Sequence, residues 1–169
     1  MASSASLAPQ EIQKKRLIRL TLAHYRNENC TEEEFYRFVT EEHAPHAAKI
    51  HARHGLDGYS LHWAPTSFRA TAKAINAGRG DPWVIRDHDV QVEFLFRDMA
   101  AMLAVVADSD FQKLHEAEAP YTSRVHIEAS LGWVETYVAG ASVVNITAEG
   151  KPDYLGWGQM SEAPLGGGK

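Results

Sequence analysis

The sequence predicts an α+β domain with the ferredoxin-like split βαβ arrangement, in which helices cover one face of an antiparallel sheet. Three observations predict it. Four segments alternate apolar and polar residues with the period of a strand. Amphipathic helical segments lie between the first and second of them and between the third and fourth. The 169 residues, 44% of them hydrophobic, suffice for one globular domain with its own core.

Composition narrows the class of function. The net charge of −5 and the pI near 6.0 argue against a nucleic-acid partner, because phosphate binding needs a basic surface. The single cysteine, Cys30, has no second cysteine with which to form an internal disulfide. No apolar stretch near the N-terminus is long enough for a signal peptide or a membrane span. We therefore expect a cytoplasmic protein with no membrane partner.

The chain divides into three parts. Residues 1–14 are mostly small and polar, which predicts a flexible leader. Residues 15–139 hold the strands and helices of the domain, interrupted by an excursion at about 67–89. Residues 140–169 have only brief strand character and form a tail, which we expect to pack over a neighbour or over the mouth of the site.

The first strand is predicted at residues 15–26, where Ile18, Leu20 and Leu22 alternate with more polar residues. His24 continues the apolar side of this strand and Tyr25 continues the other side. Either ring is placed to stand at the strand end near the helix entrance, and the pattern does not decide which.

The longest amphipathic segment runs from Thr31 to His54. Thr31 followed three residues later by Glu34 is a capping box, so the helix is expected to begin at about Glu32. At about 100° per residue, one side of the helix carries a set of inward-facing residues. These are Phe35, Phe38, Val39, His46 and Ile50, with His43 at the edge of the set.

Pro45 lies inside this helix and predicts a break or kink near His43 and Ala44, because proline lacks a backbone donor and clashes with the preceding turn. The break would expose polar backbone beside His43 and His46. The two imidazoles are then either partly buried rings satisfied by neighbouring carbonyls or functional groups. A zinc site is disfavoured, because the segment lacks the HExxH order.

The second strand is predicted at residues 59–66, with Tyr59, Leu61 and Trp63 on one side and His62 on the other. His62 is either a half-exposed strand residue or, if that face closes over a cavity, a convergent polar group.

The excursion at 67–89 starts with a short helix, Phe68–Ala77, and continues as a stretch rich in Gly, Asp and charge. A connection of this length predicts a lid or rim that offers Trp83, Arg86 and His88 to a ligand. The alternative is a solvated excursion pinned to the body by its tryptophan.

The second half repeats the strand, helix, strand order. The third strand, Val90–Phe96, has a clear apolar face, with Glu93 on the opposite face. Two helical pieces follow, Met99–Val106 capped by Asp98 and a second one that starts near Asp108 and runs over Phe111–Ala117. The fourth strand is predicted at Ile127–Val138.

A second copy of the chain is expected to cover the sheet face that has no helices. We assign to that face a set of residues too apolar for water, namely Leu61, Trp63, Leu131, Trp133 and Tyr137 or their neighbours of opposite parity. A two-fold dimer of packed sheets, with a cavity between or within them, follows from this assignment.

Three stretches are similar to EthD-domain proteins of the dimeric α+β barrel superfamily: the strand ending in Tyr25-Arg26, the helix TEEEFYRFVTEEHAPHAAKI and the strand VQVEFLFRD. The resemblance covers about residues 15–138. The length of the chain and its excursion at about 67–89 resemble the fungal members of this family, which tailor polyketides in secondary metabolism. The resemblance implies a cofactor-independent decarboxylase of a polycyclic aromatic acid, of the anthracenone or atrochrysone carboxylic acid type. It also implies that the protein acts as a homodimer without a metal.

The resemblance implies that His43, which matches the signature histidine of the family, is the acid or oxyanion donor. His62 or His24 is the second donor or proton relay, and His46 is a supporting candidate because the helical projection places it further inward. The expected substrate-binding residues are Tyr59, Trp63, Trp83, Glu93 and Trp133.

Two other functions fit the same pattern. One is a cofactor-independent anthrone monooxygenase or a polyketide dehydratase or cyclase, since all of them use an aromatic-lined cavity and an acid–base pair. The other is a non-catalytic ligand-binding or stress-response dimer, in which the histidines only satisfy hydrogen bonds.

Overall fold

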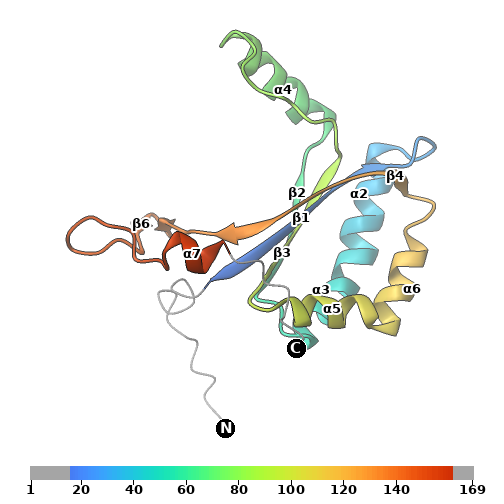
Figure 1. The fold of residues 1–169 in the computed structure, drawn as a ribbon. Coiled ribbons are helices and arrows are strands. Elements are labelled where there is room, and N and C mark those ends of the chain that lie inside the picture. Colours follow the sequence, from blue (N-terminus) through green and yellow to red (C-terminus); the bar gives the residue numbers. More distant parts are fainter. Residues whose placement is uncertain (1–15, 162–169) are drawn as a thin grey trace.

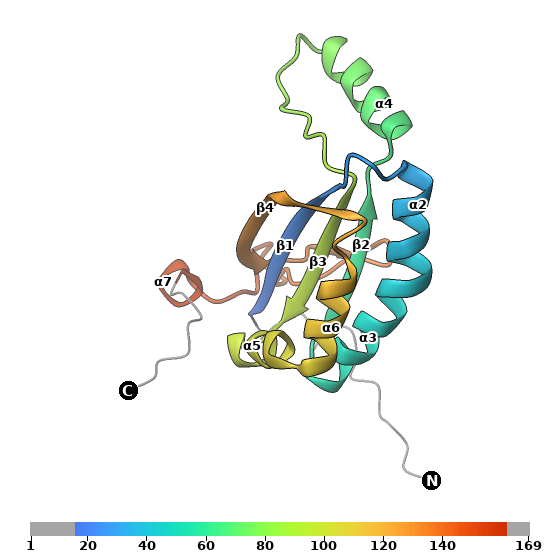
Figure 2. The same ribbon diagram turned by 90° about the vertical axis from the view of Figure 1, so that its right-hand side faces the viewer.

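The computed structural model describes residues 16–161, which form a four-stranded antiparallel sheet with helices on one face (Figures 1 and 2). The strands pair in the order β2-β3-β1-β4, which is the predicted ferredoxin-like topology. Their bounds are Leu17–Arg26 for β1, Gly58–Trp63 for β2, Val90–Phe96 for β3 and Thr122–Val134 for β4. The predicted leader, residues 1–14, lies outside the described residues.

The helices follow the strands in two βαβ units. Their bounds are α2 Glu32–Arg37, the π-helix η1 Phe38–His43, α3 Ala44–Arg53, α4 Thr66–Ala77, α5 Met99–Ala107, α6 Ser109–Ala117 and α7 Trp157–Met160. In Figure 2, α2, α3, α5 and α6 lie over one face of the sheet, whereas α4 projects away from it. The predicted caps Thr31, Asp98 and Asp108 are each confirmed by a side chain that accepts a hydrogen bond from the first turn.

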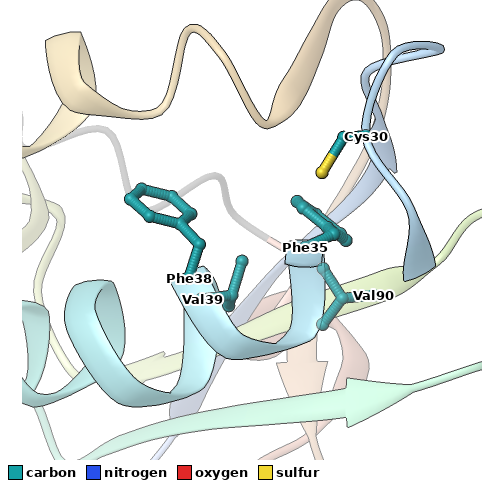
Figure 3. Close-up of a cluster of buried hydrophobic side chains, with 5 residues drawn as sticks. All are labelled: Cys30, Phe35, Phe38, Val39 and Val90. Carbon is teal, nitrogen blue, oxygen red and sulfur yellow. The ribbon is translucent and has the colours of Figure 1, made fainter. Parts of the chain in front are cut away.

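Alternation along the strands determines which side chains face the helices. His24 of β1 pairs with Val90 on one side and with Ile127 on the other, so these three share the helix-covered face. Tyr25 therefore lies on the opposite face. Figure 3 shows the core cluster where the first helix meets this face, with Phe35 between Cys30 and Val90.

The helix after Thr31 does not break at Pro45. Instead α2 continues through η1 into α3, and the Ala44 amide donates to the Val39 carbonyl, one residue further back than in an α-helix. The wider turn adds about one residue and therefore rotates the second half of the helix by about 100°. Ala47, Ile50 and His51 are buried as a result, and the projection that placed His46 inward is wrong: His46 is exposed.

The assignment of apolar residues to the uncovered sheet face is also wrong. Leu61 and Trp63 face the helices and pack against the cluster around Phe35. Leu131 pairs with Leu20 and shares that same face. The opposite face carries mostly small and polar residues, which include Arg19, Thr21, Ala23, Tyr25, Ser60, His62, Gln91, Glu93, Glu128 and Ser130. Its apolar character is therefore lower than the sequence pattern suggests.

The excursion forms an arm that points away from the helices of the domain (Figures 1 and 2). Arg69 of α4 fixes its base, since it donates to the carbonyls of Ala64 and His88 and to the buried carboxylate of Asp89. Within the arm, Asn76 exchanges two hydrogen bonds with the Trp83 backbone. The arm thus has its own internal structure and does not lie over the helix side of the sheet as a lid.

The fourth strand begins earlier and ends earlier than predicted. It starts at Thr122, directly after α6, and ends at Val134, so Tyr137 lies beyond it. The tail then forms a hairpin, β5 Val138–Ala139 with β6 Ser142–Val143, and α7 lies near the end of its described part. Trp157 of α7 contacts Trp133 edge to face, so the tail packs at the far end of β4.

The capping box gives a direct test of how the helix start contributes to stability. Replacing Thr31 by Ala removes the acceptor for the Glu34 amide, and we expect the free energy of unfolding to fall by about 1 kcal/mol. Urea denaturation measures it. Thr71→Ala, in the exposed middle of α4, is the matched control with an expected change within about 0.5 kcal/mol. Equal losses in both variants would contradict a specific role of the cap.

Candidate active site

A cavity of about 410 Å³ lies between the sheet and the helices of the same chain. Its walls come from β1, β2 and β3, from the helix that contains η1, and from α5 and α6. Most of the lining is apolar and includes Leu22, Phe35, Phe38, Val39, Leu61, Val92, Phe94 and Met102. Its polar lining consists mainly of imidazoles, one carboxylate and one phenol: His24, His43, His51, His115, Glu118 and Tyr59. Such a site suits an apolar ligand with a few polar groups.

Glu118 lies at the centre of the polar lining. His43 Nε2 is 2.7 Å from Glu118 Oε1, and His115 Nδ1 is 3.2 Å from Glu118 Oε2. The side chains of His43 and Glu118 are only 14% and 15% exposed, whereas His115 is 56% exposed. The carboxylate therefore joins a buried imidazole to one that reaches solvent.

Local structure brings these groups together. His43 is the last residue of η1, and Glu118 caps the C-terminal end of α6. A carboxylate at this end of a helix opposes the helix dipole, so the position is favourable only with cationic neighbours. Phe38 stacks on Tyr121 with the ring centroids 4.0 Å apart, which holds the two helix ends side by side.

Glu118, His43, His115 and His24 form an acid–base cluster, and their charges shift one another's pKa values. Burial raises the pKa of Glu118, but the close contact with His43 and the charges of His43, His115 and His24 outweigh it, so the pKa lies below its ordinary value. Burial lowers the pKa of His24, and the charge of Glu118 opposes this shift only in part. Glu118 is thus an anion at neutral pH and His24 is a neutral imidazole.

A second polar pair lies elsewhere in the same cavity. The rings of His51 and Tyr59 are 4.7 Å apart, and His51 is 2% exposed. His51 Nδ1 and the Tyr59 hydroxyl are both buried without a hydrogen-bond partner among residues 16–161. Each such atom costs about 1–3 kcal/mol of folding free energy. Burial lowers the pKa of His51 to about 4, and burial also raises the pKa of the Tyr59 phenol, so both groups are neutral at neutral pH.

The structure brings together only part of the residue set that the sequence suggested. His24, His43 and Tyr59 line the cavity. His62 and Glu93 lie on the other face of the sheet, because they alternate with the cavity-lining residues of β2 and β3. His46 is exposed and its Nδ1 contacts the Glu42 carbonyl oxygen at 2.7 Å.

The three tryptophans expected to bind substrate do not line the cavity. Trp63 packs behind Phe35 in the core, at 5.8 Å between ring centroids. Trp83 stays within the arm, where Arg79 lies over its ring. Trp133 contacts α7 and donates a hydrogen bond to Glu135 at the far end of β4. Phenylalanines and Tyr59 form the aromatic walls of the cavity instead.

Sequence reasoning missed Glu118, His115 and His51. His51 follows His43 by eight residues and lies on the same inward face of the helix. A projection at a constant angle per residue turns His51 away from the sheet, because it omits the extra residue in the π-helical turn. For the other two, a signal was present: His115 and Glu118 are three residues apart in the last turn of a helix, where a carboxylate is unexpected.

No group of three or more His, Cys, Asp or Glu side chains within residues 16–161 is placed to hold a metal ion. Among these residues, no helix is both long and apolar enough to cross a membrane.

The protein is an α+β protein with a ferredoxin-like fold. Its sheet and helices enclose a cavity with clustered imidazoles. The EthD domain model matches residues 27–124, which include His43 and Glu118. A protein of Aspergillus terreus named "Putative oxygenase" is 42% identical over 146 residues, which are 86% of this chain and 91% of that protein. The chain therefore belongs to the EthD family.

Two further proteins are similar to this chain. "Conidial pigment biosynthesis dehydratase EthD" of Metarhizium robertsii is 24% identical over 147 residues, which are 85% of this chain and 99% of that protein. The crystal structure of an EthD-family protein from Bacillus halodurans is 13% identical, with a TM-score of 0.48, and covers 69% of this chain and 96% of that chain.

The buried His51 predicts how stability depends on pH. Its pKa is about 4 in the folded state and 6.5 in the unfolded chain, so between these values only the unfolded state binds the proton. The free energy of unfolding therefore falls as the pH drops from 6.5 towards 4, by about 1.4 kcal/mol per pH unit for this group. His51→Asn removes that part of the slope in denaturation experiments. His46→Gln, at an exposed position, leaves the slope unchanged; the same slope in His51→Asn would contradict the assignment.

Proposed function

We propose that this EthD-family protein is an enzyme that decarboxylates a polycyclic aromatic polyketide acid of the anthracenone type without an organic cofactor. The observation that carries the proposal is the carboxylate of Glu118, held between His43 and His115 on the wall of a mostly apolar cavity. A buried carboxylate with two imidazoles is a typical acid–base arrangement.

The cavity suits the substrate class in volume and in chemistry. About 410 Å³ lies within the usual range for small-molecule sites. Phenylalanine, leucine and valine side chains offer contact to a flat ring system and keep water away from its acid group. A carboxylate in such surroundings loses the hydration that stabilises its charge, and loss of carbon dioxide relieves this cost.

The proposed reaction starts from a β-keto acid anion. The bond between the ring carbon and the carboxylate breaks, carbon dioxide leaves, and the electron pair moves onto the keto oxygen to form an enolate. The protonated imidazole of His43, with Glu118 as its counter-ion, stabilises the enolate oxygen by a hydrogen bond. Proton transfer from His43 to the ring carbon completes the product.

The other two imidazoles of the cluster, those of His115 and His24, have distinct roles in the proposed reaction. His115 contacts the second oxygen of Glu118 and is half-exposed, so it passes a proton from solvent to the cluster and recharges His43. His24 borders the cavity as a neutral ring and is available as a second hydrogen-bond donor to the substrate.

An oxygenase is the second candidate. The relative from Aspergillus terreus, 42% identical, is named "Putative oxygenase". The same cluster could remove a proton from an anthrone, and molecular oxygen would then be the co-substrate. A dehydratase, as in the name of the relative from Metarhizium robertsii, would use the same acid–base pair. Oxygen dependence and the released product separate the three.

A homodimer remains part of the proposal. The sheet face opposite the cavity has no helix over it among residues 16–161, and the small residues Thr21 and Ala23 lie near its centre. Two such faces can approach closely, while charged residues such as Arg19 and Glu93 pair around them.

Single substitutions in the cluster test the catalytic assignment. Purified protein, incubated under anaerobic conditions with an anthracenone β-keto acid, is expected to release carbon dioxide. His43→Gln and Glu118→Gln are each expected to lower the rate of release about a hundredfold or more, because each removes the acid or its counter-ion. Mass spectrometry of the product and carbon dioxide detection measure the rate.

Two matched controls keep the test specific. His46→Gln changes an exposed imidazole on the same helix, and His62→Gln changes one on the opposite sheet face. Both are expected to keep the wild-type rate. Turnover only in the presence of oxygen would favour the oxygenase instead, and undiminished rates in both cluster variants would refute the assignment of His43 and Glu118.

A further inference from the structure

The buried pair His51 and Tyr59 has no part in the reaction described above. His51 Nδ1 and the Tyr59 hydroxyl are inaccessible to solvent and lack a partner among residues 16–161, yet both residues line the cavity. The ring of His51 is fixed by Phe94 and Phe111, at 5.1 and 5.8 Å between centroids, so its nitrogen is held in place. Unpaired polar atoms on residues that line a cavity mark a position for a ligand atom.

The pair lies further along the cavity than the acid–base cluster, near enough for the charge of Glu118 to act on Tyr59. On the helix, His51 follows His43 by eight residues, which is a rise of about 12 Å. On the sheet, Tyr59 lies in the row of Phe94 and Leu20, four residues along β1 from His24, which is about 13 Å. The backbone positions that carry the two polar groups are therefore about equally far apart along the helix and along the sheet.

The two ends also differ in charge. The cluster at one end holds the anionic Glu118 with imidazoles that can carry positive charge. At the other end, burial keeps His51 as a neutral imidazole and Tyr59 as a neutral phenol. A neutral ring nitrogen and a hydroxyl can together donate to a keto oxygen, or donate to and accept from a phenolic hydroxyl. Neither of these two side chains carries a charge that could pair with an ionised ligand group.

We infer that His51 and Tyr59 form a binding subsite for a neutral keto or phenol oxygen at the end of the substrate remote from the reacting acid group. This inference rests on the proposed function for the orientation of the substrate, and it specifies the substrate further. The ligand is a rigid aromatic system with its acid group at one end and a keto or phenol oxygen at the other.

Three probes that share one ring skeleton and one acid group test the subsite by their binding affinities alone. The first is anthracene carboxylate. The second carries a hydroxyl on the terminal ring far from the acid, and the third is a ring-reduced analogue with a keto oxygen at that position. Isothermal titration calorimetry of the full chain is expected to show about tenfold tighter binding for at least one oxygen-bearing probe than for the first. The tighter of the two identifies the preferred oxygen.

Variants then assign the preference to the two residues. Tyr59→Phe is expected to lose most of it while binding anthracene carboxylate as the wild type does, and to melt at or above the wild-type temperature because an unpaired hydroxyl is gone. His51→Leu is expected to lose the preference and His51→Asn to restore part of it. Tyr36→Phe removes a hydroxyl outside the cavity and should change nothing.

The outcomes separate this inference from the proposed function. Equal affinity of the wild type for all three probes, or an equal loss for all probes in Tyr59→Phe, would overturn the subsite even if carbon dioxide is released. An oxygen preference that depends on Tyr59 and His51 would support the subsite even if no decarboxylation occurs.

Discussion

The wide turn at Phe38–His43 determines which imidazoles reach the cavity. A regular α-helix through this segment would point His46 towards the sheet and turn His51 away from it. The extra residue in the turn reverses this, so His43 and His51 share the inward stripe of a continuous helix. Pro45 fits directly after the turn, because its missing amide removes a donor where the hydrogen-bond pattern already changes. A local irregularity thus positions both polar ends of the site.

Glu118 connects this helix to the second half of the chain. A carboxylate at the C-terminal end of α6 is unfavourable by itself, and its burial adds to the cost. Contacts with His43 and His115 offset both effects and keep the group ionised. The unpaired atoms of His51 and Tyr59 are a second local cost in the same cavity. Functional sites commonly concentrate such costs, and here both lie in one cavity.

Much of the fold could be predicted from the sequence, because period-two alternation and helix caps are local signals. The third strand, the cap at Thr31 and the strand order follow from them. The sheet face taken by Leu61 could not be decided, since parity alone does not say which side the helices cover. His43 was accessible through the EEHAP motif. Glu118 was accessible only in part: its position beside His115 at the end of α6 is a local signal, but its contact with His43 joins residues 75 positions apart, which no local pattern encodes.

The division of the cluster between the two βαβ units has a consequence for how the protein matures. His24 and His43 belong to the first unit, and His115 and Glu118 belong to the second. A nascent chain that has only released its first half already contains the imidazole, but it lacks the counter-ion. The cluster therefore forms only when the two units dock, so a measurement of the proposed activity would report on native assembly more stringently than helix or sheet content does.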